Sequence, residues 1–356
     1  MRVRATARAG AASLLALALV AAGCGDSDDD SDEGQAVTTT TAEATTTTDA
    51  VEVPDGIVVG AGMNDPDDPT IAVLAFMPAA ISVEAGTPVQ WEWNGAEPHS
   101  VTFLDEGQTL PPPGSDTSLF GPTPPTGPYG GTGFVNSGLQ PLGPTAPAPF
   151  EMTFSNPGTY SYYCVIHPQM VGEITVEAVG ATVDSPATVA QARAAEAAQW
   201  LEEGRAAKAE LVDADPVKED NADGTTTWTV HMGASTAHTD ILAFAPTPAE
   251  VKAGDTVRFL NTSGAPHTAS FFGEGAEPIA SPVDPKVDPP APGPSPQVLL
   301  AKGFFNTGLL PPDAPPGAGP PEAVRSFSFT VPDAGSYSYV CILHSPSQMV
   351  GTITAT

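Results

Sequence analysis

The sequence has few cysteines, few histidines and few basic residues. Its 356 residues include three cysteines, six histidines and 12 lysines and arginines, against 42 aspartates and glutamates. The formal net charge of −30 makes nucleic acid a poor partner, because such a surface repels phosphates. A basic protein partner would be attracted to it, although solubility alone also explains an acidic surface.

The sequence also has no apolar run long enough to span a membrane. A run of about a dozen apolar residues follows Arg2, Arg4 and Arg8, whereas a spanning helix needs roughly 20. This pattern predicts a signal peptide over residues 1–23. Its end, VAAGC, resembles a bacterial lipoprotein signal, which implies that Cys24 is lipidated and begins the mature chain. The alternative is an ordinary signal peptide followed by an unmodified cysteine.

Residues 24–54 are acidic and then threonine-rich, with almost nothing to bury. We expect this segment to be a disordered tether with a reach on the order of 30 Å. Together with a lipid on Cys24, it predicts an exported protein anchored on the outer face of the bacterial cytoplasmic membrane. Nine basic and 42 acidic residues follow Cys24.

The second half of the chain repeats the first. Residues 74–107 align with 242–275 without a gap, at an offset of 168. Further matching blocks are GFVNSGLQP (133–141) with GFFNTGLLP (303–311), and FEMTFSNPGTYSYYC (150–164) with FSFTVPDAGSYSYVC (327–341). The offset grows only within Pro/Gly-rich loops, where insertions are tolerated. Two copies of one fold are therefore expected.

Each copy alternates apolar and polar residues in short runs between glycine and proline turns, which predicts strands of an antiparallel sandwich or barrel. We expect one such domain at 55–180 and another at 223–356. The linker, 181–222, contains an alanine-rich helix at 185–212, with Ser185 as N-cap and Pro186 at its first position. This helix is expected to be weakened at Gly204 and to pack on the domains through Trp200, Leu201 and Leu211.

Two long proline-rich insertions, at about 105–132 and 274–301, separate the repeat blocks. Loops of this length are uncommon in compact domains and are often functional or mobile. The alternative, which we weigh equally, is that the two insertions are ordered surface covers without a direct role.

The repeat carries one set of metal-ligand residues twice. Cysteine ends a strand, histidine follows three positions later, methionine opens the next strand, and another histidine lies 65–75 residues upstream. The sets are His99, Cys164, His167 and Met170 in the first copy, and His267, Cys341, His344 and Met349 in the second. One thiolate, two imidazoles and a weak thioether suit a blue copper centre, although the spacing alone indicates only a site for a soft metal.

Alternatives exist for each residue type in these sets. The histidines could be core or turn residues, and the methionines could be core residues. The cysteines could be buried unreactive thiols, or could form one disulfide, although two equivalent sites do not naturally meet in space.

On these residues, both copies resemble the cupredoxins, the family of plastocyanin and azurin. The resemblance covers about 70–356 apart from the linker and insertions. It implies two tandem Greek-key β-sandwich domains in an all-β protein, and two type 1 coppers per chain, each held by one of the sets above. The short loop around His167 and Pro168 is similar to that of amicyanin, whereas the longer loop before Met349 is similar to that of plastocyanin.

The residue after the first ligand histidine departs from the family pattern. Many members have asparagine there, which bonds to the ligand sulfur, whereas this chain has Ser100 and Thr268. We expect their hydroxyls to make the same bond and to tune the copper potential.

Two-domain cupredoxins that are enzymes have a histidine beside the ligand cysteine and His-x-His pairs upstream. Here tyrosine and valine precede the cysteines, valine and isoleucine follow them, and no His-x-His occurs. Only His231 and His238 remain outside the two sets, with no role that the sequence assigns. A carrier of electrons is therefore favoured over an enzyme.

The carrier would exchange electrons with a redox partner protein such as a cytochrome or a membrane oxidase. A copper-binding or copper-buffering protein without electron transfer is the alternative. Less favoured is a copper oxidase or reductase whose catalytic copper lies between subunits.

Overall fold

The computed structural model describes residues 54–141, 146–274, 295–313, 319–344 and 349–356. Residues 50–356 form one compact unit. The predicted signal peptide, Cys24 and the tether up to residue 53 lie outside the described residues, as does most of the second insertion. Within the described part, no helix combines the length and the apolar character needed to cross a bilayer.

The fold is all-β with one long helix, as predicted. The first copy of the repeat contains nine strands: β1 (Ile57–Asn64), β2 (Ile71–Met77), β3 (Ala80–Glu84), β4 (Pro88–Asn94), β5 (Thr102–Phe103), β6 (Val135–Asn136), β7 (Phe150–Thr153), β8 (Gly158–Tyr163) and β9 (Val171–Glu177). The second contains β10 (Lys218–Asp220), β11 (Thr226–Ser235), β12 (Thr239–Ala245), β13 (Ala249–Val251), β14 (Thr256–Asn261), β15 (Ser270–Phe272), β16 (Gln297–Val298), β17 (Phe304–Asn306), β18 (Ser326–Thr330), β19 (Gly335–Val340) and β20 (Val350–Ala355).

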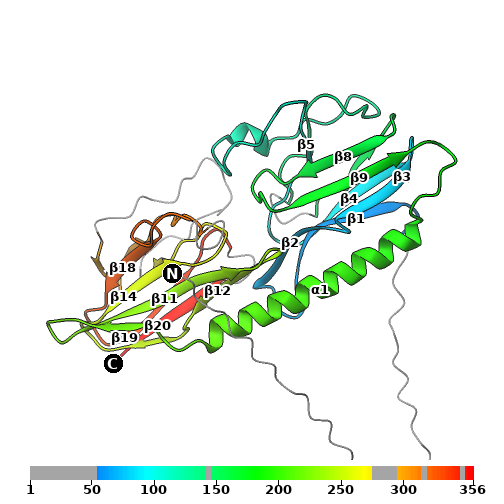
Figure 1. Cartoon of the computed structure of the whole chain (residues 1–356). Helices are drawn as coiled ribbons and strands as arrows, with labels where there is room; N and C mark the ends of the chain where they lie inside the picture. Colours follow the sequence, from blue (N-terminus) through cyan, green and yellow to red (C-terminus); the bar gives the residue numbers. More distant parts are fainter. Residues whose placement is uncertain (1–53, 142–145, 275–294, 314–318, 345–348) are drawn as a thin grey trace, which may run out of the picture. The chain divides into compact units, whose positions relative to one another are not determined.

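A ten-stranded sheet runs through both copies, in the order β16-β18-β14-β11-β12-β2-β1-β4-β7, with β10 beside β11 (Figure 1). Each copy adds a five-stranded sheet, β3-β9-β8-β5-β6 in the first and β13-β20-β19-β15-β17 in the second. Buried side chains of the large sheet and of one small sheet form each core, as in a sandwich.

The two copies meet at β2 and β12, which pair antiparallel. The pairing is centred on Ala72 and Asp240, which occupy the same position in the repeat, 168 residues apart. Two further backbone bonds extend it, from Leu74 N–H to the His238 carbonyl and from Leu242 N–H to the Thr70 carbonyl, each 2.7 Å long. The sequence predicted two domains but not this shared sheet; the domain boundaries themselves stay predictions.

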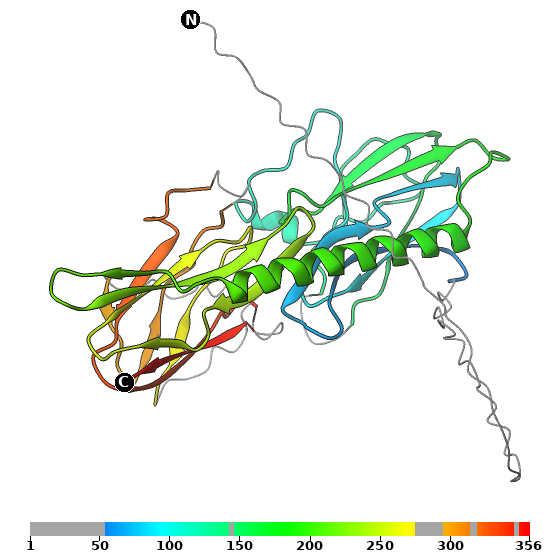
Figure 2. The ribbon, with the colours of Figure 1, turned by 60° about the horizontal axis from the view of Figure 1, so that its bottom comes forward.

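The linker helix α1 (Pro186–Asp213) packs along β2 and β12, with β1 and β11 beside them (Figures 1 and 2). Ser185 caps it as predicted, since its hydroxyl accepts from the Thr188 N–H at 3.1 Å. Trp200 and Leu201 pack on the apolar side chains of β2. The helix α1 continues through Gly204, which is buried, and the expected weakening there stays a prediction.

The first insertion is ordered on the surface of its copy. It contains a short 3-10 helix, η1 (Thr117–Phe120), whose Leu119 carbonyl accepts from the Asn136 side-chain amide at 2.7 Å. Tyr129, near its end, is buried against Phe103 and Phe154. The insertion is therefore a packed cover rather than a free loop.

Candidate metal centres

The first centre brings together residues from two loops at one end of the first sandwich. His99 lies between β4 and β5, whereas Cys164 and His167 follow β8. The Nδ1 atoms of His99 and His167 are 3.0 Å apart, and the Cys164 Sγ lies 3.5 Å from Nδ1 of His167. His99 and Cys164 are buried, while His167 is partly exposed. The structure thus gathers three of the four predicted ligands.

The loop from Cys164 to Met170 is closed by its own backbone. The Cys164 N–H donates to the Met170 carbonyl at 3.1 Å, and the Met170 N–H donates to the His167 carbonyl at 2.9 Å. Met170 is 1% exposed and packs in the first core with Cys164. The backbone of the short loop therefore fixes the positions of the thiol, the imidazole and the methionine relative to one another.

The second centre repeats this geometry. The Nδ1 atoms of His267 and His344 are 3.0 Å apart, and the Cys341 Sγ lies 3.7 Å from the first and 3.3 Å from the second. The Cys341 N–H donates to the Met349 carbonyl at 3.0 Å, and Met349 is fully buried. All three of the clustered ligands are buried here. Cys164 and Cys341 are both free thiols, so no disulfide joins them.

Ser100 and Thr268 lie beside the ligand sulfurs. Their backbone N–H groups reach the sulfurs, at 3.5 Å to Cys164 and 3.4 Å to Cys341. Each hydroxyl also accepts from the N–H of the residue after the cysteine, Val165 or Ile342, at 3.0 Å. A hydrogen bond from the Ser100 side chain acts to lower the pKa of Cys164, although burial outweighs it. The hydroxyls therefore brace the cysteine loops.

The outer nitrogens of the histidines distinguish the two centres. Nε2 of His267 lies 2.6 Å from the Ser263 hydroxyl. Gly95 stands at the repeat position of Ser263, and Nε2 of His99 is buried without a hydrogen-bond partner among the described residues. With Nδ1 turned towards the metal position, Nε2 carries the proton and donates, so the second centre holds its histidine by a bond that the first lacks.

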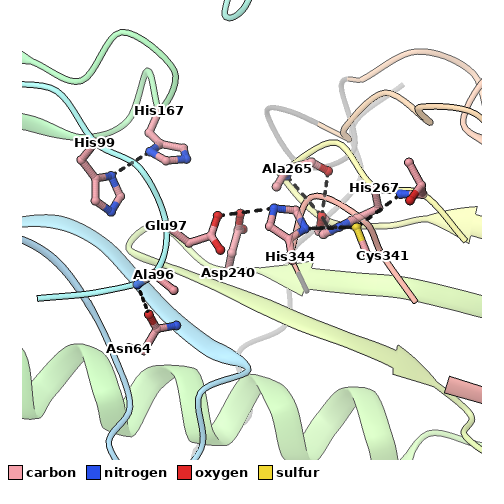
Figure 3. A network of polar contacts seen from close by, with 12 residues as sticks. Asn64, Ala96, Glu97, His99, His167, Asp240, Ala265, His267, Cys341 and His344 are labelled. Atoms are coloured by element: carbon pink, nitrogen blue, oxygen red, sulfur yellow. Dashed lines mark hydrogen bonds and ion pairs between the residues drawn. The ribbon is translucent and has the colours of Figure 1, made fainter. Parts of the chain in front are cut away.

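The outer nitrogen of His344 has a partner from the other copy. Its Nε2 lies 3.4 Å from a carboxylate oxygen of Glu97, and both side chains are nearly buried, at 7% and 11% exposure (Figure 3). Glu97 precedes Pro98 and His99, so it belongs to the loop that supplies a ligand to the first centre. This contact joins the two centres.

Burial favours the neutral form of three of the four ligand imidazoles, those of His99, His167 and His267. It lowers the pKa of His267 to about 4. Burial, assisted by the nearby His344, lowers the pKa of His167 to about 3, and burial with the adjacent His167 places the pKa of His99 well below its usual value. Neutral histidines are the form that binds a metal at pH 7.

The two thiols differ. Burial raises the pKa of Cys164. Burial also acts to raise the pKa of Cys341, but the charge and hydrogen bond of His344 outweigh it, and this pKa is lowered. The second thiol is thus the readier of the two to ionise before metal binding.

The donor sets fit copper. The Nδ1 atoms are 3.0 Å apart in both centres, close enough for both nitrogens to bind one metal ion. Thiolate sulfur with two imidazoles and a buried methionine nearby is the donor chemistry of type 1 copper.

His231 and His238 join neither cluster in the described residues. His231 lies within β11, whereas His238 is in the turn before β12 and stacks on Trp200, with ring centroids 3.6 Å apart. Nδ1 of His238 is 3.8 Å from a carboxylate oxygen of Glu203 on α1. His238 therefore helps to hold the linker helix α1 in place.

Sequence reasoning missed several residues that shape the centres: Gly62, Asn64, Glu97, Gly233 and Ser263. A β-carbon at Gly62 would lie 2.1 Å from Nε2 of His99, and one at Gly233 would lie 3.1 Å from Nε2 of His267. Both glycines have positive φ, 71° and 77°. No local signal in the repeat singles out Glu97 or Ser263, because the two copies differ at every position from 90 to 97 and from 258 to 265.

No model of a known protein family matches the chain. Among curated proteins, plastocyanin of Solanum tuberosum is 32% identical over 105 residues, which are 29% of this chain and 88% of that protein. Chloroplastic plastocyanin of Solanum lycopersicum is 32% identical over 105 residues, but only 51% of its length is spanned. Amicyanin-alpha of Methylorubrum extorquens is 28% identical over 107 residues, covering 30% of this chain and 68% of that protein.

Solved structures of the same kind are similar to part of the chain. Amicyanin from Paracoccus versutus has a TM-score of 0.23 at 22% identity and covers 35% of this chain and 86% of its own. A purple cupredoxin from Nitrosopumilus maritimus has a TM-score of 0.22 at 22% identity, with 34% and 99% covered. Because the Solanum tuberosum match reaches 32% identity along 88% of that plastocyanin, the chain belongs to the cupredoxin family, as its Cys-His-Met motifs predicted.

Proposed function

We propose that this chain is an exported, membrane-tethered blue copper protein that carries electrons through two type 1 copper sites. The observation that supports it most strongly is the repetition of one geometry: two His-Cys-His clusters with 3.0 Å between Nδ1 atoms, each closed by a cysteine-to-methionine backbone bond. Bound copper would supply a one-electron couple between Cu(II) and Cu(I).

The folded chain holds the ligands in fixed positions and keeps water away from them. The ligands are held by the sandwich, by the loop bonds and by the Ser100 and Thr268 braces, so little has to move when the charge of the site changes. Burial of both cysteines excludes water from the sulfur side. Such a preset site favours fast electron transfer over chemistry on a substrate.

The surroundings support a carrier rather than an enzyme. Tyr163 and Val165 flank one ligand cysteine, and Val340 and Ile342 flank the other, so neither cysteine has an adjacent histidine to hold a further copper. His231 and His238 lie outside both clusters of the described part.

The decisive experiment combines copper analysis with visible absorption for the wild type, Cys164→Ser and Cys341→Ser. Each substitution removes a thiolate whose bond to copper gives the blue colour, so each should abolish about half of the absorbance. Full colour in either variant overturns the assignment of that cysteine. A wild type that binds copper but stays colourless and redox-inert would favour the copper-buffering alternative.

The tether is tested separately, because it depends on the sequence motif at Cys24. A bacterial host given radiolabelled palmitate should label the full chain and leave it in the membrane fraction. Cys24→Ser should be unlabelled and released. Equal labelling or equal membrane retention of both chains contradicts lipidation at this residue.

A further inference from the structure

We propose that the two copper sites exchange electrons within one chain, and that the contact between Glu97 and His344 is their link. The inference depends on the proposed function, because it requires copper at both centres. One electron leaves the reduced site of one copy and enters the oxidised site of the other. No bond forms or breaks, and no proton or outside reductant takes part in the exchange.

The path consists of one short covalent run and one contact. Glu97, Pro98 and His99 are consecutive, and Nδ1 of His99 faces the first centre. The Glu97 carboxylate then lies 3.4 Å from Nε2 of His344, whose Nδ1 lies 3.3 Å from the Cys341 sulfur. The path therefore begins on one ligand histidine and ends on another (Figure 3).

The Glu97 end of the path is fixed. The Asn64 side-chain oxygen accepts from the Ala96 N–H at 2.7 Å, and its amide donates to the Pro69 carbonyl at 2.8 Å, so β1 holds the Glu97 loop. The Trp93 indole N–H donates to the His99 carbonyl at 3.1 Å. The β2–β12 pairing holds the two copies together near the same place, at Ala72 and Asp240. The surrounding structure therefore holds the Glu97 carboxylate beside His344.

Only the first copy supplies a carboxylate at this position to a ligand histidine of the other copy. Ala265 occupies the position of Glu97 in the second copy and has no side-chain oxygen to offer His167. A carboxylate that accepts from a ligand histidine makes that ligand more basic and favours the oxidised metal. Glu97 should therefore lower the reduction potential of the second site and leave the shared electron mainly on the first.

The two sets of ligands differ in burial, and this difference indicates what electron exchange between the sites would achieve. His167 is the one ligand of the two described clusters that is partly exposed, whereas all three of the second cluster are buried. Electron transfer slows steeply with distance, so a partner protein reaches the first site more easily. Exchange through Glu97 would connect the buried second site with the outside through the first.

The test uses full-length, copper-loaded protein. The spectra of Cys164→Ser and Cys341→Ser first assign the absorption of each site. A radiolytic pulse then reduces fewer than one site per oxidised chain, and the redistribution of absorbance is followed. In the wild type it should be first-order, with a rate that does not depend on protein concentration.

Glu97→Ala should slow this redistribution on the order of tenfold, the lower end of the 10–100-fold loss in metal affinity or activity that follows removal of a partner of a ligand histidine. Glu97→Gln should slow it less, because its amide oxygen can still accept from Nε2, and it should raise the potential of the second site. Glu203→Ala is the matched control: it also removes a carboxylate that faces a histidine, at 3.8 Å, but that histidine is no ligand. Its rate should equal that of the wild type.

An unchanged rate in Glu97→Ala, or a redistribution whose rate rises with protein concentration, overturns the link while leaving the carrier function intact. If neither site is blue and reversibly reduced, the proposed function fails, and the link fails with it.

A second measurement needs no copper, so it also serves for variants that bind copper poorly. In metal-free protein labelled with ¹⁵N-histidine, Glu97→Gln should shift the His344 Nε2–H resonance and leave that of His267 in place; an unmoved His344 resonance contradicts the contact.

Discussion

The ring of His99 lies directly against Gly62. A β-carbon at Gly62 would fall 2.1 Å from Nε2 and 2.4 Å from Cδ2 of that ring. Gly62 has a φ of 71° and sits where the pairing of β1 with β2 shifts register. Gly233 lies at the corresponding irregularity between β11 and β12, where a β-carbon would be 3.1 Å from Nε2 of His267 and 2.6 Å from the Ile241 carbonyl oxygen. Each bulge therefore makes room for one ligand histidine.

Gly62→Ala should remove copper from the first site only. The new methyl group would displace the His99 ring, and the positive φ adds about 1 kcal/mol of backbone strain. Copper analysis and absorbance should show loss of the first-site signal with the second retained. Gly86→Ala is the control, since its φ is 89° but nothing lies within 4 Å of a β-carbon there. If both variants keep two coppers, the contact does not shape the site.

Ser263→Ala should weaken only the second site. It removes the acceptor 2.6 Å from Nε2 of His267, which orients the ring and increases its basicity. Copper affinity of the second site should fall about tenfold, the lower end of what such partners contribute. Competition with a copper chelator, monitored through the absorbance of each site, measures this. A first site that weakens equally would mean that the serine acts on the whole fold instead.

The eight predicted ligands show what the sequence could reveal. Cysteine, histidine and methionine at fixed spacing, repeated twice, are a local pattern, and the structure gathers the two His-Cys-His trios that this pattern named. Ser100 and Thr268 were placed correctly beside the sulfurs, but the contacts of their backbone N–H groups depend on loop geometry that spacing does not contain.

The joining of the two copies could not be predicted. The apolar residues of β2 and β12 suit buried strands but do not say that the two strands pair with each other rather than end separate sheets. The Glu97 contact depends on that pairing, because the two residues are far apart in sequence and lie in different copies. Gly204 is a similar case: its poor helix propensity follows from the sequence, but its packing against Ile71 does not, because Ile71 lies on another element.

Gly204→Ala should destabilise the protein, although alanine is the better helix former. A β-carbon there would lie 2.5 Å from Cγ2 of Ile71 and 3.4 Å from Cγ2 of Thr239. Overpacking of this kind costs roughly 1–3 kcal/mol, which exceeds the gain of about 1 kcal/mol from helix propensity. Denaturant unfolding compares it with Ala206→Gly at an exposed position of α1, which should lose about 1 kcal/mol. A more stable Gly204→Ala would contradict the packing of α1 on β2 and β12.

The central claim is that one chain carries two redox-active copper sites. A reductive titration of the oxidised, copper-loaded protein, followed by its blue absorbance, counts the electrons that each chain accepts. The account predicts that bleaching is complete and reversible only after two electrons per chain, with two coppers present. Complete bleaching by one electron, or copper that never takes up an electron, would contradict it.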